Sequence, residues 1–290
     1  MKIGFIGIGV MGNSMATHLL QAGHSLHIYT RTKQKAETLI QKGAKWHQHI
    51  ATLAVESDLI ITMVGYPSDV REVYFGENGI IENAKKGTYL IDMTTSEPSL
   101  AIEIYEKAKA KGLYALDAPV SGGDVGAKEA RLTIMVGGDE QVFQHCEEVL
   151  KTLGTNVILQ GGAGAGQHTK MCNQITIASN MIGVSEAIVY AEQAGLDVEK
   201  VLASISTGAA GSWSLSNLAP RMIQGDFEPG FYIKHFIKDM QIAMKEAENM
   251  GIQTPGLVLA NGLYEKLSSL GEGNSGTQAL YKLYKEKSEQ

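Results

Sequence analysis

The chain has 290 residues, of which 44% are hydrophobic and 19% charged, and its formal net charge is −6. This composition is typical of an ordered globular protein of one or two domains, and it excludes a disordered chain. The acidic balance, without any basic run, argues against a nucleic-acid partner. Cys146 and Cys172 are too few for a disulfide framework or a metal centre, and no apolar stretch is long enough to cross a membrane. We therefore expect a cytoplasmic protein with no metal site and no membrane partner.

The first half of the chain alternates short apolar runs with amphipathic segments. Helices are predicted over residues 14–22 and 99–111, the second beginning after Pro98 and ending at Gly112. Strands are predicted over residues 3–6, 26–29, 59–64, 89–92, 113–117 and 132–136. Alternation at this spacing indicates an α/β fold with a doubly wound, mainly parallel sheet of the Rossmann type.

The second half has a different character, because helical periodicity replaces strand-like runs after the glycine-rich residues 161–166. Residues 167–194 contain no proline and only Gly183, so they predict one helix roughly 40 Å long. Further helices over residues 198–205, 236–250 and 255–270 would cover it. We place the domain boundary here, which gives an α/β domain over residues 1–162 and an all-helical domain over 163–290. The polar tail from Lys282 onward is expected to be frayed.

The first strand leads into the turn Gly7-Ile8-Gly9-Val10-Met11-Gly12, which also begins a helix. In this context the first glycine permits the tight turn, the second lets the backbone approach a pyrophosphate, and the third lets helix and strand pack closely. A plain packing turn is the alternative, but the position directly after a strand favours a dinucleotide-binding fingerprint. We therefore predict that all six residues contact a nicotinamide cofactor.

The end of the second strand indicates which cofactor binds. NAD-specific fingerprints carry an acidic residue there, whereas this chain has Thr30-Arg31-Thr32. A guanidinium suits a 2′-phosphate, so NADP is favoured over NAD. The alternatives are that Arg31 is a solvated loop cation or stacks on the adenine. Met63 and Val64, which end the third predicted strand, are further expected cofactor contacts.

Hydride transfer to a carbonyl needs a group that moves a proton, and Lys170 is the best candidate. It lies in the first turn of the long helix, and Asn173 and Gln174 follow at i+3 and i+4, so the three share one face. A partly desolvated lysine beside an oxidised nicotinamide would have a lowered pKa, which suits general acid–base catalysis. A solvated lysine near a helix start is the alternative on spacing alone.

Two segments at the carboxyl edge of the predicted sheet are expected near this lysine. Ser121, Gly122 and Gly123 follow the fifth strand, and their hydroxyl and backbone amides could hold a carboxylate. An ordinary turn is the alternative. Thr95 follows the fourth strand, where it would either touch the nicotinamide or cap the helix that begins near Pro98.

These motifs occur in an order that resembles the β-hydroxyacid dehydrogenase family over nearly all of the chain. Residues 4–12 are similar to the family's cofactor signature, 117–123 to its substrate segment and 164–170 to its catalytic segment. Gly230-Phe231, followed by Lys238-Asp239, is similar to a fourth family element. The resemblance is therefore specific in both motif and order.

The resemblance implies a role for each matching residue. Lys170 would be the general acid for carbonyl reduction and the base for oxidation. Ser121, Gly122 and Gly123 would bind the substrate carboxylate, and Thr95 would lie at the nicotinamide. Lys238 would reach the cofactor, while Phe231 and Asp239 would shape the site. The family usually has asparagine four residues after the lysine, so Gln174 puts that substrate contact in doubt.

We therefore predict an NAD(P)-dependent oxidoreductase that interconverts a small 3-hydroxy acid and its semialdehyde or keto acid. NADPH-dependent reduction of glyoxylate or succinic semialdehyde is an alternative. An imine reductase of similar architecture is disfavoured by Lys170, and a non-catalytic dinucleotide-binding scaffold is disfavoured because the lysine, serine and glycines are all present. The apolar second half is expected to form a homodimer or homotetramer, and the sequence does not identify the physiological substrate.

Overall fold

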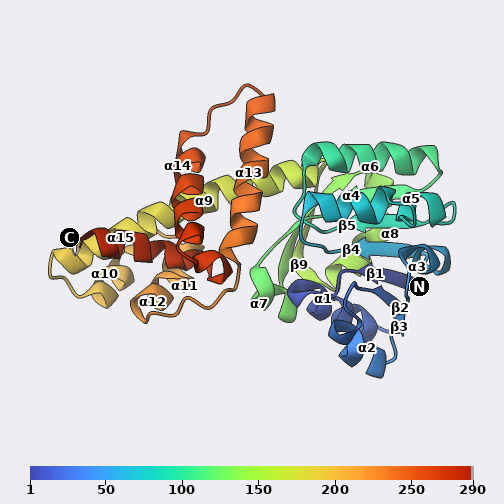
Figure 1. The fold of residues 1–290 in the computed structure, drawn as a ribbon, viewed down its shortest axis with the longest axis horizontal. Helices are drawn as coiled ribbons and strands as arrows, with labels where there is room; N and C mark the ends of the chain where they lie inside the picture. Colours follow the sequence, from blue (N-terminus) through green and yellow to red (C-terminus); the bar gives the residue numbers. More distant parts are fainter. Residues whose placement is uncertain (289–290) are drawn as a thin grey trace. The chain divides into compact units, whose positions relative to one another are not determined.

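The computed structural model describes residues 1–288, which divide into two compact units, the first over Met1–Lys170 and the second beginning at Met171. The first unit is built on one nine-stranded sheet (Figure 1). Its order is β3-β2-β1-β4-β5-β6-β8-β7, and β9 pairs with β8. The strands are β1 Lys2–Ile6, β2 Ser25–Tyr29, β3 Lys45–Trp46, β4 Leu59–Thr62, β5 Tyr89–Asp92, β6 Tyr114–Asp117, β7 Val120–Ser121, β8 Leu132–Gly138 and β9 Gly154–Gly161.

The six strands from β3 to β6 in this order are parallel, whereas β8 runs antiparallel to β6 and β7. The predicted doubly wound, mainly parallel fold is therefore confirmed. β3, β7 and β9 were not predicted. β3 and β7 have two residues each, and most residues of β9 are exposed or half-buried, so none produces a long apolar run.

Helices pack on both faces of the sheet because successive strand side chains point to opposite sides. Ile3 and Phe5 of β1 pack into one apolar core, and Ile6 packs into the other. The helices of this unit are α1 Val10–Gln21, α2 Glu37–Gln41, α3 Ile50–Glu56, α4 Pro67–Phe75, α5 Ile80–Asn83, α6 Pro98–Ala110, α7 Gly123–Lys128 and α8 Glu140–Lys151.

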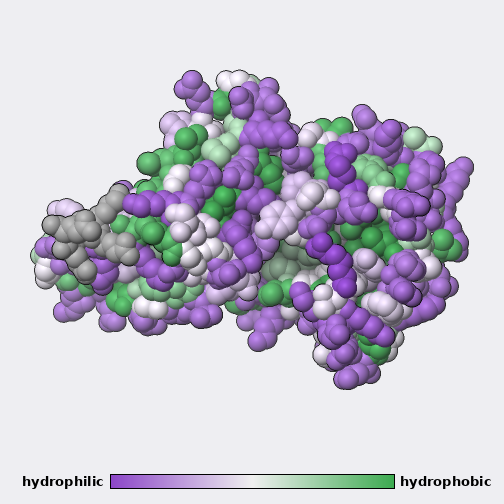
Figure 2. Space-filling model, in the orientation of Figure 1, coloured by the Kyte–Doolittle hydropathy of each residue, from purple (hydrophilic) through white to green (hydrophobic). Residues whose placement is uncertain are grey.

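The second unit is helical throughout and has its own apolar core, which includes Met181, Phe236 and Tyr264. The long predicted helix is confirmed as α9, Ala165–Gln193, whose first residues belong to the first unit. The other helices are α10 Val198–Ile205, α11 Trp213–Asn217, α12 Ala219–Ile223, α13 Ile233–Asn249, α14 Pro255–Ser269 and α15 Leu280–Ser288. Several hydrophobic side chains of this unit reach the surface (Figure 2).

The prediction of a frayed tail from Lys282 onward is wrong for most of that segment. α15 continues to Ser288, and Leu283 is buried in the core of the helical unit. Apolar residues every few positions give this helix one side that packs on the core. The many charged residues between them make the segment look solvent-exposed in the sequence. The last two residues of the predicted tail lie outside the described residues. No helix within residues 1–288 has the length and hydrophobicity needed to span a membrane.

Candidate active site

The glycine-rich turn joins β1 to α1 at the carboxyl edge of the sheet. Gly7 has φ +103°, and a Cβ atom there would collide with the Met63 carbonyl oxygen. A Cβ atom at Gly12 would collide with the carbonyl oxygen of Gly7, so this glycine permits close packing of α1 on the turn. Around Gly9, in contrast, a Cβ atom would have no protein atom within 4 Å. Contacts within the protein therefore explain the glycines at positions 7 and 12, whereas Gly9 leaves its backbone open to a ligand.

The beginning of α1 is suited to a negatively charged ligand. Its N-cap is Gly9, which makes no side-chain capping bond, and its first turn has no acidic residue. Val10 is 62% exposed, so this end of the helix reaches solvent. Helix N-terminal amides have no intrahelical acceptor and carry partial positive charge, which together favour a phosphate. The residues present therefore fit the pyrophosphate of a dinucleotide.

The ends of β2 and β4 lie beside this turn. The Gly7 amide donates to the Tyr29 carbonyl oxygen over 3.0 Å, which joins the turn to the chain just before Thr30, Arg31 and Thr32. Arg31 is largely exposed, and its Nη1 lies 3.3 Å from Asp69 Oδ1 at the beginning of α4. Following Met63, the Val64 amide donates to Thr94 Oγ1 over 3.0 Å.

The first turn of α9 is tied to the ends of β5 and β6 by two buried side chains. Asp117 Oδ1 accepts from the Gly164 amide and Oδ2 from the Gln167 amide, both over 2.8 Å. The Gln167 side chain accepts from the Ser96 amide over 3.0 Å and donates to the Thr94 carbonyl oxygen over 2.7 Å. A side chain with both a donor and acceptors can satisfy two loop backbone groups at once. This network fixes where α9 begins.

Lys170 follows Gln167 by three residues on the same helix and is only 7% exposed. The predicted alternative, a solvated lysine, does not describe this side chain. Lysine is rarely buried in proteins unless a specific environment holds it. Thr95, in the loop after β5, is half-buried. The N-cap residue of α6 is Glu97, so Thr95 is not the cap of that helix.

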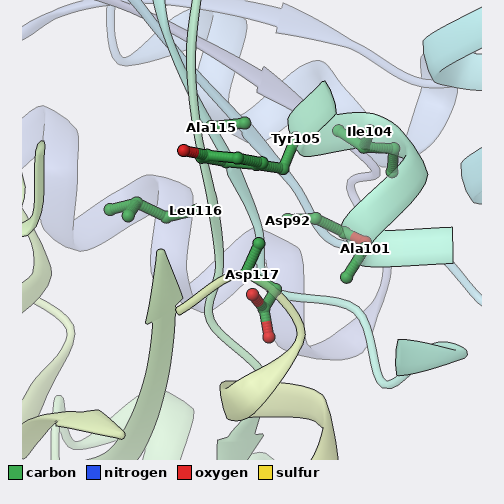
Figure 3. Close-up of a pocket in the computed structure, with 8 residues that line it drawn as sticks. Asp92, Ala101, Ile104, Tyr105, Ala115, Leu116 and Asp117 are labelled. Atoms are coloured by element: carbon green, nitrogen blue, oxygen red, sulfur yellow. The ribbon is translucent and has the colours of Figure 1, made fainter. Parts of the chain in front are cut away.

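The same edge of the sheet holds two buried carboxyl groups (Figure 3). Burial raises the pKa of Asp92 to about 6, although Thr62 Oγ1 and the Thr94 amide both donate to it. Burial also raises the pKa of Asp117. Together with Ala101 and Tyr105 they line a cavity of about 10 Å³ beside α6. A space of that size holds at most one water, so it is not a substrate pocket.

The predicted substrate segment forms the turn from β7 into α7. Ser121 is half-buried at the end of β7, while Gly122 and Gly123 have φ values of +128° and +63°. Residues with side chains rarely adopt such angles, so the turn alone explains both glycines. The same lack of side chains leaves the backbone of the turn uncovered. This geometry is compatible with both the turn and the carboxylate-binding interpretations.

A polar group lies within the helical unit, one turn after Lys170. Asn173 Nδ2 donates to Gln174 Oε1 over 2.7 Å, and Gln174 Nε2 donates to Asp239 Oδ2 over 2.6 Å. Lys238 Nζ forms an ion pair with Asp239 Oδ1 at 2.9 Å, but that oxygen has no hydrogen-bond partner among the described residues. The two side chains therefore form an ion pair, but their geometry is not that of a hydrogen bond. The Gln174 side chain therefore holds Asn173 and Asp239 in position through these two hydrogen bonds.

Phe231 lies two residues before α13, the helix that carries Lys238 and Asp239. Its ring packs edge-on against Phe236, with ring centroids 5.7 Å apart. The segment of chain before α13 is held further by the bridge between Tyr232 and Gly276. Phe231 therefore supports the start of the helix on which two of the predicted site residues lie.

Three contributors to this region were missed in the sequence. Gln167 gave no signal, because a glutamine in a helical run is usually a surface residue. Asp117 ended a predicted strand, but its carboxylate was not expected to anchor α9. Asp69 lies far from Arg31 in sequence, and its position in the first turn of α4 was the available signal. Each pairs with a residue many positions away, which periodicity does not reveal.

The comparisons with known proteins cover both units. Residues 2–162 match the family model of the NAD-binding domain of 6-phosphogluconate dehydrogenase. Residues 164–284 match the model described as NAD-binding of NADP-dependent 3-hydroxyisobutyrate dehydrogenase. An uncharacterised oxidoreductase of Bacillus subtilis, YkwC, is 66% identical over 97% of this chain and 98% of its own length.

Two further relatives carry more specific names. A probable mitochondrial 3-hydroxyisobutyrate dehydrogenase-like protein of Arabidopsis thaliana is 49% identical over 96% of this chain and 84% of its own length. The 3-hydroxyisobutyrate dehydrogenase of Mycobacterium tuberculosis, solved with L-serine, is 30% identical, and the match covers 98% of each chain with a TM-score of 0.91. These matches confirm the resemblance drawn from the motifs: the chain belongs to the β-hydroxyacid dehydrogenase family of NAD(P)-dependent oxidoreductases.

Proposed function

We propose that this enzyme interconverts a small 3-hydroxy acid and its semialdehyde, with Lys170 as the group that moves the proton. The bound nicotinamide supplies or accepts the hydride. The observation that carries the proposal is the burial of Lys170 one turn after Gln167, whose side chain bonds the loop that follows β5. The names of the matched relatives support the same substrate class.

Lys170 acts on the oxygen of the reacting carbon. During reduction its ammonium group donates a proton to the carbonyl oxygen as negative charge develops there. During oxidation the neutral amine accepts that proton from the hydroxyl group. The bonds from Asp117 and Gln167 hold the first turn of α9, and so they limit the positions available to the lysine.

The substrate carboxylate binds at Ser121, Gly122 and Gly123 in this proposal. A hydroxyl group and uncovered backbone amides are suitable donors to a carboxylate. Asn173 and Asp239 are further proposed substrate contacts, and Gln174 acts as a positioning residue through its bonds to both. The family's usual substrate contact from asparagine then falls to Asn173.

We further propose that NADP is the preferred cofactor. No carboxylate stands at Thr30 to accept from a ribose 2′-hydroxyl, and Arg31 is exposed beside it. Its partner Asp69 is a single charge in a solvated pair, which contributes about 1 kcal/mol or less. A 2′-phosphate has a larger charge and three acceptor oxygens, so it can draw the guanidinium away from Asp69.

The test of the lysine is its replacement in the full-length enzyme. Lys170→Ala should lower kcat by about 100-fold to 10,000-fold, the usual range for a general acid. NADPH affinity, measured by nucleotide fluorescence, should change little. Lys200→Ala, which removes an exposed lysine of the helical unit, is the matched control and should have normal kcat. Near-normal turnover of the Lys170 variant would remove it from the acid–base role.

A screen of substrates would identify the physiological pair. NADPH consumption should be measured with methylmalonate, succinic and tartronate semialdehydes and with glyoxylate, and 3-hydroxy acids should be tested in the reverse direction. The highest kcat/KM is expected for a 3-hydroxy acid or its semialdehyde. A preference for glyoxylate or succinic semialdehyde would favour the alternative reductase function. No turnover with any of them would favour a scaffold.

The proposal also covers the oligomeric state and the cellular compartment of the enzyme. We infer a homodimer or homotetramer formed through the helical unit, because Tyr190, Trp213 and Leu259 expose large apolar side chains there. A reducing compartment such as the cytoplasm suits the enzyme, since Cys146 is buried and Cys172 is exposed as free thiols.

A further inference from the structure

Two histidines and a glutamate converge on one side of the sheet, in a region that the proposed reaction does not use. His27 lies in β2, His47 follows β3, and Glu56 is the last residue of α3. Both histidines are only 5% exposed. His27 Nδ1 lies 2.9 Å from His47 Nε2 and 3.6 Å from Glu56 Oε2. The three ligand atoms all lie within 4.8 Å of one another.

The hydrogen bonds around the pair determine which nitrogen carries each proton. Thr52 Oγ1 donates its only proton to the His49 carbonyl oxygen over 2.8 Å. It must therefore accept from His47 Nδ1, which lies 3.2 Å away. His47 Nε2 is then an unprotonated acceptor, and His27 Nδ1 donates to it. Thr52 thus presents the Nε2 lone pair of His47 toward the centre of the cluster.

The spacing of the three atoms is close to that of a zinc site. Zinc bonds to histidine nitrogen and carboxylate oxygen are about 2.0–2.2 Å long, so tetrahedral ligands lie about 3.3–3.6 Å apart. The 2.9 Å separation of the two histidine nitrogens is shorter than that range, and the 3.6 Å separation of His27 and Glu56 lies at its upper end. Small movements of the Glu56 side chain and the His27 ring would bring all three to one ion. Glu56 can move because its side chain is 42% exposed.

We propose that His27 Nδ1, His47 Nε2 and Glu56 Oε2 bind a zinc ion, with water completing its coordination. Two imidazoles and one carboxylate with an open position form a donor set that zinc accepts. His27 binds by moving its Nδ1 proton to Nε2 through solvent, so both rings stay neutral. Thr52 is the second-shell partner that orients His47. The ion would join β2, β3 and α3.

Lys45 is the competitor for this site. Its Nζ forms an ion pair with Glu56 Oε2 at 2.5 Å, and its side chain is 57% exposed. The ammonium can therefore turn out to solvent when a cation takes its place, at the small cost of an exposed ion pair. The expectation of no metal site rested on the number of cysteines, and it did not consider histidines separated by twenty residues.

The test is zinc titration of the tag-free, full-length, chelator-treated protein by calorimetry. The wild type should bind one zinc ion per chain and unfold at a higher temperature with zinc than without. Glu56→Gln should weaken binding by more than about tenfold, and Thr52→Val by about tenfold, the usual effect of losing a second-shell partner. Lys45→Gln should tighten binding, because it removes the competing cation.

His49→Ala is the matched control, since it removes a neighbouring exposed histidine and keeps the backbone carbonyl that Thr52 uses. Its zinc affinity should equal that of the wild type. Cobalt(II) in place of zinc should give the strong visible absorption of tetrahedral coordination in the wild type and lose it in His47→Gln. Unchanged zinc affinity in Glu56→Gln, weakening by His49→Ala, or no saturable binding would each overturn the proposal.

Discussion

Arg31 is the residue on which the proposed preference for NADP depends most directly. Its guanidinium is solvated and paired with Asp69, whose other carboxylate oxygen accepts from the Tyr66 amide at the beginning of α4. Asp69 therefore connects the end of β2 to the α4 turn. An exposed pair of this kind is weak, so it keeps the guanidinium nearby without preventing its contact with a phosphate.

Arg31→Ala should weaken NADP binding by about tenfold or more, the typical value of a hydrogen bond to a charged group. NAD affinity should change much less, because NAD has no 2′-phosphate. The measurement is the dissociation constant of each nucleotide by fluorescence titration. Asp69→Asn is the control, because its amide oxygen can still accept from the Tyr66 amide. Equal losses for both nucleotides would reject 2′-phosphate recognition.

Gln174 is a residue whose role the sequence left open. Asparagine is usual at this position in the family, and the longer glutamine side chain here reaches Asp239 in α13. Both of its polar ends have protein partners, and the residue is only 1% exposed. Its length is thus explained by a contact between helices, which a single sequence does not reveal.

Gln174→Met keeps the approximate volume of the side chain but removes both hydrogen bonds. Asp239 Oδ2 and Asn173 Nδ2 would each lose the partner described above, so we expect a loss of about 1–3 kcal/mol in the free energy of unfolding. Urea unfolding measures it. Gln241→Met, at an exposed position of α13, should change stability by less than about 0.5 kcal/mol. Equal stabilities for the two variants would contradict the buried network.

At the scale of elements, the sequence predicts what is local and regular. The residues of β1, β4 and β5 are nearly all buried, so they appear as apolar runs. The glycine turn is equally visible because its three constraints fall within six residues. The anchoring of α9 is not visible, since Gln167 bonds residues 71 and 73 positions away in the chain. Such pairs depend on tertiary packing and leave no periodic pattern.

Asp92, at the end of β5, makes the stability of the folded protein depend on pH. Its pKa is about 6 in the folded protein, above its ordinary value of 3.8. The folded state therefore keeps this proton over a range in which the unfolded state has released it. Asp92 therefore contributes its full stabilisation below pH 3.8, and this contribution is lost as the pH rises through about 6.

Asp92→Asn should remove that dependence, because the amide oxygen can still accept from Thr62 and Thr94. Relative to the wild type, the variant should gain up to about 3 kcal/mol in unfolding free energy between about pH 4 and about pH 7. Urea unfolding across this range measures the difference. Glu148→Gln, at an exposed position of α8, should keep the wild-type slope. A variant with an unchanged slope would show that Asp92 is already ionised near its ordinary pKa.

At the scale of the whole molecule, each unit has its own core, and the helical unit exposes as many large apolar side chains as the longer first unit. Trp213 is 67% exposed and Leu259 58% exposed. Scattered apolar residues are normal on protein surfaces, but Tyr190, Trp213 and Leu259 are large side chains on three helices of one unit, and they support the proposed contact with another chain. A second copy of this chain is the partner that we propose for these side chains.

We therefore expect light scattering to give the mass of a dimer or tetramer at micromolar concentration. The double variant Trp213→Glu and Leu259→Glu should shift the mass toward the monomer, because burying two carboxylates in an apolar interface is strongly unfavourable. Ile158→Glu, on an exposed position of β9, should keep the wild-type mass. Circular dichroism must show that both variants are folded. A wild-type monomer at every concentration would mean that these side chains face solvent, and it would reject the proposed assembly.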